Sequence, residues 1–330
     1  KDLDGDGGDL PNGEVIDTVS LVSANGVASS TTEGAGLYEG NISIAETSAD
    51  NQTLTGSKGF DQENYDISYE TGNLTINRRA ITLKASDQEK IYGDVLKLDD
   101  TKFTALDLDG DSVLPNSEVI TNVSIASATD KDSSTDSDVG TYTDEIQILS
   151  PVTGTDGDGD GFLESNYDIS YVSGNLTISP REITLTVDEQ VKIYGEVLEL
   201  DGEKFTTLDK EDGGGLPNDE EVKSLNLNSL KNKDTSTFAS VDDYPNEIQV
   251  TGIKEVEKGF DVNNYTINYV SGNLKIAPRK ITLTASGQEK IYGDDLDLGS
   301  TKFTVEDLDG GDLPNGEKID AVSLVSADGV

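Results

Sequence analysis

The stretch Asn64-Tyr-Asp-Ile-Ser-Tyr-Glu-Thr-Gly-Asn-Leu-Thr-Ile76 decides the fold class of this chain. Apolar and polar residues alternate on both sides of its Gly-Asn pair, as they do in half-buried β-strands. Gly-Asn between two such runs is typical of a tight hairpin turn, because one central residue of that turn must adopt a positive φ. The stretch therefore predicts a β-hairpin, and close copies of it occur at 166–178 and 264–276.

Two further markers recur around this stretch in a constant order, which indicates an internal repeat of about 100 residues. Ile-Thr-Leu followed by Lys-Ile-Tyr-Gly occupies 81–93, 183–195 and 281–293, and Leu-Pro-Asn-x-Glu begins at Leu10, Leu114, Leu216 and Leu313. We expect a segment of a longer tandem array. Its predicted parts are the carboxy-terminal part of a module (1–79), two complete modules (80–181 and 182–279) and the amino-terminal part of a module (280–330).

Other alternating segments predict strands at 81–85, 119–126, 142–149 and 167–171. No segment keeps a 3.6-residue period, so we expect at most a short turn near Leu-Pro-Asn or in Phe103 to Asp107. Joints such as Ser179-Pro180-Arg181 are too short and too stiff to be flexible tethers. The expected fold is mainly β: tandem modules of about 100 residues, each an Ig-like β-sandwich or a β-grasp-like module, arranged as an extended rod.

Composition excludes several function classes. The chain has 24 Lys+Arg and 65 Asp+Glu, a formal net charge of −41, so it lacks the basic face that nucleic acids and anionic membranes require. It contains no apolar run long enough for membrane insertion. Cys, His and Trp are absent, which removes the thiol nucleophile, the commonest general base and the best platform for sugars. We expect no enzyme.

Several of the recurring motifs resemble MBG-type repeats of bacterial surface proteins, especially the subtype marked by Tyr-Gly-x. The matching pieces are the Ile-Thr-Leu starts, Lys-Ile-Tyr-Gly-Asp at 90–94 and 290–294, Val139-Gly140-Thr141-Tyr142, and the Asn-Tyr-x-Ile-x-Tyr stretches. The resemblance covers the whole chain and implies a stalk element of a large secreted adhesin, extracellular on the bacterial cell surface, with no catalytic residues. One departure is Glu196, which follows Gly195 where the other modules have Asp.

An Asp-Gly loop in the second module is a candidate calcium site. Asp156, Asp158 and Asp160 alternate with glycine, as in the first half of an EF-hand loop, and Ca²⁺ prefers six to eight oxygen ligands. The bidentate Glu expected at the twelfth position is replaced by Tyr167, so Glu164 or Asp168 would have to substitute. The alternative is a solvated acidic loop.

A second acidic cluster recurs before each Leu-Pro-Asn. Crowded carboxylates raise one another's pKa unless a cation offsets the repulsion, so the recurrence favours one Ca²⁺ per module near a joint. The alternative is a polar turn that uses Asp and Gly for backbone reasons. The candidate ligands are Asp4, Asp6 and Asp9, then Asp107, Asp109 and Asp111, then Asp307, Asp309 and Asp312, with a weaker set at Asp209, Glu211 and Asp212.

Lys and Tyr of the Lys-Ile-Tyr-Gly marker also recur. We expect Lys90, Lys192 and Lys290 to pair with surface acids, the alternative being a covalent bond from a buried lysine to an asparagine. The tyrosines Tyr92, Tyr194 and Tyr292 are expected to pack at the edge of a module rather than to bind a ligand.

The leading hypothesis for function is a structural segment of an adhesin stalk or filament-forming surface fibre, stiffened by Ca²⁺ at the Asp-rich loops. Its partners would be neighbouring modules of the same chain and, in a fibre, identical chains that associate through sheet edges or shared ions. The alternative is a carbohydrate- or surface-binding repeat. That function needs an exposed aromatic face repeated in register, and the sequence shows no flat ladder of this kind.

Overall fold

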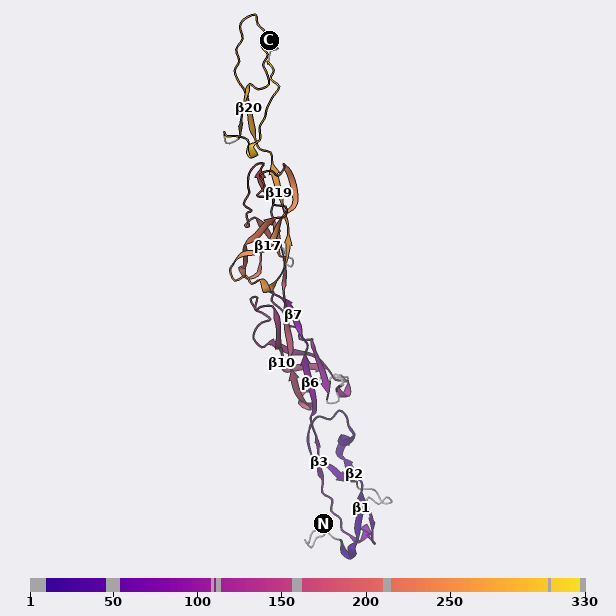
Figure 1. Ribbon diagram of the computed structural model, residues 1–330. Coiled ribbons are helices and arrows are strands. Elements are labelled where there is room, and N and C mark those ends of the chain that lie inside the picture. The colour runs from indigo at the N-terminus through magenta and orange to yellow at the C-terminus, as the bar shows by residue number, and fades with distance from the viewer. Residues whose placement is uncertain are drawn as a thin grey trace. The chain divides into compact units, whose positions relative to one another are not determined.

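The protein is described by a computed structural model over residues 10–45, 54–107, 110, 114–155, 162–209, 215–307 and 310–326. These residues form β-strands joined by loops and short 3-10 turns, and they contain no α-helix (Figure 1). The prediction of a mainly β protein is confirmed, while the choice between an Ig-like and a β-grasp-like module stays a prediction. Within the described part of the chain, no helix is long and apolar enough to cross a membrane.

Contacts divide the chain into two compact units. The first comprises Lys1–Glu89, Leu96–Ser133 and Thr141–Thr177, and the second comprises Lys90–Val95, Ser134–Gly140 and Ile178–Val330. The segments 90–95 and 134–140 belong to the second sequence repeat, yet they pack in the same unit as the third repeat.

The third repeat consists of two sheets. One has the order β15-β13-β18 and the other β14-β19-β17-β16. The pairs β13/β18 and β14/β19 are parallel, whereas β13/β15, β16/β17 and β17/β19 are antiparallel. The strands are β13 (Arg181–Val187), β14 (Gln190–Ile193), β15 (Phe205–Asp209), β16 (Glu221–Ser229), β17 (Asp242–Glu257), β18 (Tyr265–Val270) and β19 (Gly272–Ala277).

The second repeat has the same arrangement, with sheets of order β11-β6-β8 and β7-β12-β10-β9. The strands predicted at 81–85, 119–126, 142–149 and 167–171 are confirmed, each within a somewhat longer strand. The strands of the second repeat are β6 (Arg79–Ala85), β7 (Gln88–Ile91), β8 (Phe103–Asp107), β9 (Val119–Ser127), β10 (Gly140–Thr155), β11 (Tyr167–Val172) and β12 (Gly174–Ser179).

The core of the third repeat lies between its two sheets. Alternate residues of β13 are buried, with Ile183 and Leu185 both 0% exposed, and β13 contacts β17 and β19 of the other sheet. From β19, Leu274 and Ile276 enter the same core. Burying one such side chain contributes about 1.5–3 kcal/mol, so the alternating pattern accounts for much of the stability of each repeat.

The predicted Gly-Asn hairpin is wrong. β11 and β12 belong to different sheets, so the Gly174-Asn175 pair carries the chain across the core rather than back along its own sheet. The glycine is needed for close approach, not for a positive φ: a Cβ on Gly174 would lie 2.7 Å from the Ser86 carbonyl oxygen and 2.8 Å from that of Ala85. Gly272 meets the backbone of Asp188 in the same way, at 2.9 Å.

A 3-10 turn forms at each Leu-Pro-Asn marker, as predicted. The turns are η1 (Pro11–Gly13), η4 (Pro115–Ser117), η6 (Pro217–Asp219) and η8 (Pro314–Gly316). The other predicted location, Phe103–Asp107, is strand β8, because its Phe-Thr-Ala-Leu-Asp alternation pairs antiparallel with β6. A short turn at that position is therefore a wrong prediction.

In their described residues, the first and last repeats lack strands that the second and third repeats have. Residues 66–71 are not a strand, whereas the equivalent β11 and β18 pair with the first strands of their own repeats. The described part of the first repeat holds no such first strand. Its strands are β1 (Val15–Val19), β2 (Leu21–Ser23), β3 (Gly36–Ile44), β4 (Leu54–Ser57) and β5 (Gly72–Ile76), and the last repeat contributes β20 (Ile281–Ala285) and β21 (Phe303–Asp307).

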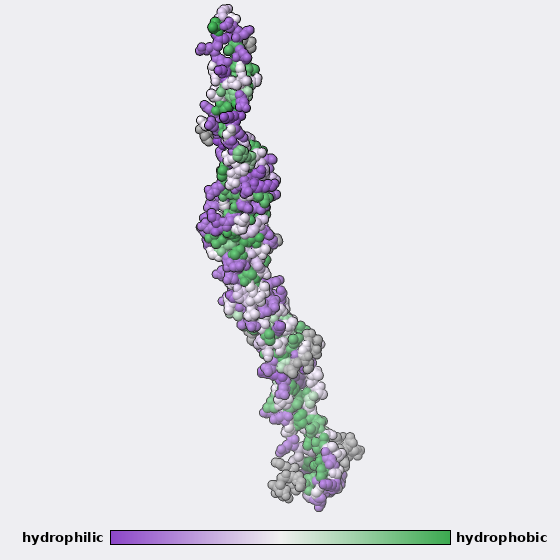
Figure 2. All heavy atoms as spheres, in the orientation of Figure 1, coloured by the Kyte–Doolittle hydropathy of each residue, from purple (hydrophilic) through white to green (hydrophobic). Residues whose placement is uncertain are grey.

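Hydrophobic side chains consequently remain on the surface of the first repeat. Ile16 and Val19 of β1 are 39% and 42% exposed, whereas the equivalent Ile120 and Val123 are 9% and 2% exposed. Figure 2 shows this hydrophobic surface in green around β1. The amphipathic strand is therefore encoded locally, and its burial depends on the rest of the repeat.

Candidate functional site at the joints between repeats

The tip of a repeat is organised by a buried lysine. We define the tip as residues 90–95 and 134–140 of the second repeat and the equivalent 192–197 and 236–242 of the third. Lys192 Nζ donates hydrogen bonds to the carbonyl oxygens of Glu196 (3.1 Å), Asp234 (3.0 Å) and Ser236 (2.7 Å), and its burial lowers the pKa of the ammonium. These hydrogen bonds go to backbone carbonyls, and the carboxylates of Asp234 and Glu196 also attract the ammonium.

The second repeat has the same arrangement at its tip. Lys90 Nζ donates to the carbonyl oxygens of Asp94 (3.1 Å) and Ser134. In both repeats the ammonium holds the Tyr-Gly turn against the second loop of the tip. The lysine thereby presents the residues that contact the next repeat.

Tyr92 of this tip inserts against the third repeat. It is 3% exposed, its hydroxyl donates to Glu220, and its ring meets the Tyr265 ring edge-on at 5.5 Å. The Tyr265 hydroxyl donates to the other Glu220 oxygen at 2.6 Å. Burial, followed by the Glu220 hydrogen bond, raises the pKa of Tyr92 to about 12 and also raises that of Tyr265. The prediction that the marker tyrosines pack at a module edge is confirmed for Tyr92 and wrong for Tyr292, which is fully exposed.

Two constraints require a glycine after this tyrosine: a positive φ and a close contact with the next repeat. Gly93 has φ +88°, and a Cβ there would lie 2.6 Å from the Pro217 ring of the next repeat. Gly195 has the same φ and would meet Pro314 at 2.5 Å. Gly293 has φ +92° but nothing within 4 Å. The Tyr-Gly pair therefore belongs to the surface where one repeat meets the next.

Comparison with known protein families finds this signature. Residues 81–177 match the family model described as MBG domain (YGX type). This segment is similar to an MBG domain. The resemblance predicted from the motifs is thus confirmed for the second repeat, and the same motifs recur in the neighbouring repeats. No curated protein and no solved structure matches the chain.

The asparagine of Leu-Pro-Asn connects successive repeats. It adopts a positive φ, which asparagine tolerates better than most residues, and its amide reaches a threonine carbonyl in the preceding repeat. The contact occurs three times: Asn116 to Thr31 at 2.7 Å, Asn218 to Thr135 at 3.0 Å, and Asn315 to Thr237 at 2.9 Å.

A second asparagine repeats in the same way. It precedes the tyrosine of each Asn-Tyr-x-Ile-x-Tyr stretch and accepts a backbone N–H from the preceding repeat. Asn166 accepts from Ala35 at 2.8 Å, and Asn264 accepts from Val139 at 2.9 Å. Because the same bonds recur at the same positions of the repeat, the joint is a built interface and not a chance contact.

The linker arginine completes the joint. Arg181, 1% exposed, donates through Nε to Asp209 and through Nη1 to Asp94, both at 2.7 Å. Desolvation lowers the pKa of this guanidinium, but the two carboxylates outweigh it and the net direction is upward. Arg79 pairs with Asp107 at 2.7 Å, and Arg279 pairs with Asp307 and with Glu196.

The roles of the arginine and of both asparagines at the joint were not predicted from the sequence. The signal that could have indicated them is recurrence, because each residue occupies a constant position of the repeat. Locally, the arginines are only parts of short linkers. Their partners lie in two different repeats, and no local pattern shows which carboxylates they meet.

The predicted calcium ligands fall into two groups. Asp107 and Asp307 lie at the ends of β8 and β21, where each accepts hydrogen bonds from a linker arginine, while Glu164 and Asp312 are exposed. Among the described residues, no group of three acidic side chains is close enough to hold an ion. The calcium site stays a prediction, because most of its ligands lie outside the described residues: Asp4, Asp6, Asp9, Asp109, Asp111, Asp156, Asp158, Asp160 and Asp309.

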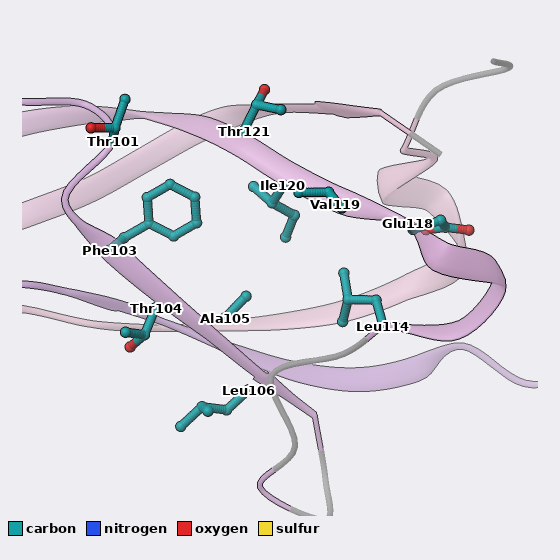
Figure 3. Close-up of a pocket in the computed structure, with 10 residues that line it drawn as sticks. All are labelled: Thr101, Phe103, Thr104, Ala105, Leu106, Leu114, Glu118, Val119, Ile120 and Thr121. Carbon is teal, nitrogen blue, oxygen red and sulfur yellow. The ribbon is translucent and has the colours of Figure 1, made fainter. Parts of the chain in front are cut away.

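A groove runs between the outer strands of the two sheets in the second repeat. Its volume is about 370 Å³, and Phe103 and Ala105 of β8 face Ile120 of β9 across it (Figure 3). An equivalent groove of about 320 Å³ lies between β15 and β16. The groove of the second repeat has mainly apolar walls and presents no convergent set of catalytic groups. It exposes the edges of strands β8 and β9 to solvent.

A tyrosine is exposed at the same position of three repeats. Tyr69, Tyr171 and Tyr269 are 36%, 40% and 43% exposed. Beside Tyr269 lies a depression of about 610 Å³, with Phe260 and Val262 among its lining residues. No sequence pattern predicted that these three tyrosines would be exposed to a similar degree.

Proposed function

We propose that this chain is a structural repeat segment of a large extracellular bacterial protein, either the stalk of an adhesin or a filament-forming surface fibre. The observation that carries the proposal is the recurring joint, in which the same asparagine, arginine and tyrosine contacts connect one MBG repeat to the next. An interface repeated at every period transmits force along a chain without a flexible tether. The proposed role is non-catalytic.

We further propose that Ca²⁺ binds the Asp-Gly loops and stiffens the array. The donor set supports this, because carboxylates alternating with glycine suit a hard cation. When bound, the ion would offset the repulsion among loop carboxylates. Asp156, Asp158 and Asp160 would hold it in the second repeat, with Glu164 nearby in the sequence.

Small-angle scattering of the whole chain tests the calcium part. In calcium the maximum dimension should be longer and more sharply defined than in chelator at matched ionic strength. The variant Asp156→Asn/Asp158→Asn/Asp160→Asn should weaken this response. A profile identical in calcium and in chelator would contradict stiffening by the ion.

Antibody labelling of the source bacterium tests the location. We expect intact cells to be labelled as strongly as permeabilised cells. Electron micrographs of the same cells should then distinguish a tethered stalk from an ordered fibre. Labelling only after permeabilisation would contradict an extracellular role.

The repeated exposed tyrosines favour a second candidate, a carbohydrate- or surface-binding repeat. An exposed aromatic ring beside an apolar depression can stack on a sugar ring. Tyr269 is such a ring. A glycan array tests this function, with Tyr269→Ala as the variant and Tyr244→Phe as a control outside that surface. Binding that is absent, or unchanged in Tyr269→Ala, would remove this candidate.

A further inference from the structure

The linker arginine bonds to carboxylates of two successive repeats at once. Arg181 reaches Asp209 at the end of β15 in its own repeat and Asp94 in the tip of the preceding repeat. It also donates to the Tyr92 carbonyl oxygen at 3.1 Å. A single buried guanidinium thus connects the following repeat to the Tyr-Gly turn that carries the joint.

The next joint repeats this geometry with a changed residue. Arg279 reaches Asp307 in its own repeat, Glu196 in the preceding tip at 3.3 Å, and the Tyr194 carbonyl oxygen at 3.4 Å. Glu196 is the residue that departs from the Gly-Asp pattern of the family. The longer side chain keeps the acidic contact, which indicates that a carboxylate at this position serves the arginine.

Only arginine fits these contacts. Its planar fork donates in several fixed directions, so one side chain can satisfy two carboxylates and a carbonyl together, whereas lysine is a point charge on a flexible stem. Removing the guanidinium would take an ion pair away from Asp209, whose side chain is 0% exposed, and losing one partner of a buried ion pair is strongly destabilising.

We infer that this arginine is the residue that positions successive MBG repeats at their joint, and that the joint forms without a metal ion. In three of the predicted calcium clusters, the first acidic residue (Asp107, Asp209 or Asp307) is the arginine's own partner. Calcium would then act on the remaining loop carboxylates and not on the joint. The inference rests on the proposed role of the repeats as joined structural elements, and it names the side chain that orders the joint.

Hydrogen exchange of the whole chain, followed by mass spectrometry, tests the inference at the tip. The informative peptides cover 90–95 and 134–140, where the Tyr92 amide bonds to Ser179 and the Val139 amide bonds to Asn264. Asp94→Asn removes only the contact to the preceding repeat, because the Arg181–Asp209 pair remains. We expect exchange in the tip peptides to rise about fivefold in Asp94→Asn and on the order of a hundredfold in Arg181→Gln.

Two comparisons separate positioning from general stability. Arg181→Lys should fall between wild type and Arg181→Gln, and Arg78→Gln, which removes an equal charge from an exposed side chain, should leave the tip unchanged. Peptides of β13 report folding of the repeat. If Arg181→Gln raises exchange in the β13 peptides too, the variant has destabilised the whole repeat. The test then depends on Asp94→Asn, which keeps the Arg181–Asp209 pair.

Chelator distinguishes the arginine from calcium. Wild-type exchange in the tip peptides should be the same in calcium and in chelator. The inference is overturned if chelator loosens the tip while Asp94→Asn does not. Failure of the proposed extracellular role would show in the labelling experiment and would leave the Arg181 result unaffected.

Discussion

The carboxylate of Glu220 accepts hydrogen bonds from two tyrosine hydroxyls, Tyr92 from the preceding repeat and Tyr265 from its own. Neither hydroxyl can ionise without placing a phenolate beside a carboxylate in a buried site. The folded joint therefore favours the protonated phenol. Burial of the phenol, followed by its hydrogen bond to Glu220 and the repulsion between the two charges, raises the pKa of Tyr92 from 10.0 to about 12.

The raised pKa predicts a joint that fails in alkali. Because the folded pKa exceeds the unfolded one, the stabilisation is complete below pH 10, falls as pH rises further, and is lost at about 12. Its size is about 2 kcal/mol. Hydrogen exchange of the tip against pH measures it. In Tyr92→Phe this alkaline loss should shrink, and an unchanged profile would contradict the role of Tyr92.

Gly93 and Gly293 form a matched pair for a second prediction. Both have a positive φ near +90°, but only Gly93 would press a Cβ onto Pro217. Gly293→Ala should therefore cost only the backbone strain, about 1 kcal/mol, and Gly93→Ala about 2 kcal/mol more. Denaturant unfolding of each variant measures the difference. Equal costs would mean that the proline contact is unimportant.

At the scale of elements, equivalent strands differ in what covers them. β13 and β20 have nearly the same sequence and both pair antiparallel with a Phe-Thr strand. Leu185 in β13 is 0% exposed, whereas Leu283 in β20 is 47% exposed. The difference arises because β13 lies beneath a second sheet, and the described part of the last repeat contains no such sheet.

This contrast predicts unequal costs for the same substitution. Leu185→Ala should lower the free energy of unfolding by about 2–5 kcal/mol, because it leaves a cavity in a closed core. Leu283→Ala should cost under about 1 kcal/mol, since its side chain is half in water already. Denaturant unfolding monitored by circular dichroism compares them. A large effect of Leu283→Ala would show that β20 is covered.

For the whole molecule, charge is the dominant feature. With 65 acidic and 24 basic residues, like charges repel along the chain and oppose the folded state. Added monovalent salt screens this repulsion, and a specifically bound divalent ion would stabilise by mass action beyond screening.

We therefore predict two separable effects of ions. Sodium chloride should raise the midpoint of thermal unfolding gradually, whereas calcium at matched ionic strength should raise it further and saturate. A calcium concentration of about 100 Kd corresponds to about 2.7 kcal/mol per site. Differential scanning calorimetry with magnesium as the control measures both. Identical thermal unfolding curves in calcium and in sodium at matched ionic strength would mean that the ions act only by diffuse screening.

Features that depend only on residues close together in the chain could be predicted from the sequence. Alternation predicted strands such as β6 and β9, Leu-Pro-Asn predicted its turn, and repeated markers predicted the period. These properties are local, because strand amphipathicity and turn geometry involve residues a few positions apart.

Only the tertiary structure decided which strands pair and which residues meet at the joint. Gly174-Asn175 reads as a hairpin locally, yet its flanking strands bind partners in different sheets. Arg181 meets Asp94, which lies 87 residues away, and Tyr92 meets Glu220, which lies 128 residues away. Such contacts depend on how sheets close and repeats abut, because burial and charge pairing are set by neighbours in space and not by neighbours in sequence.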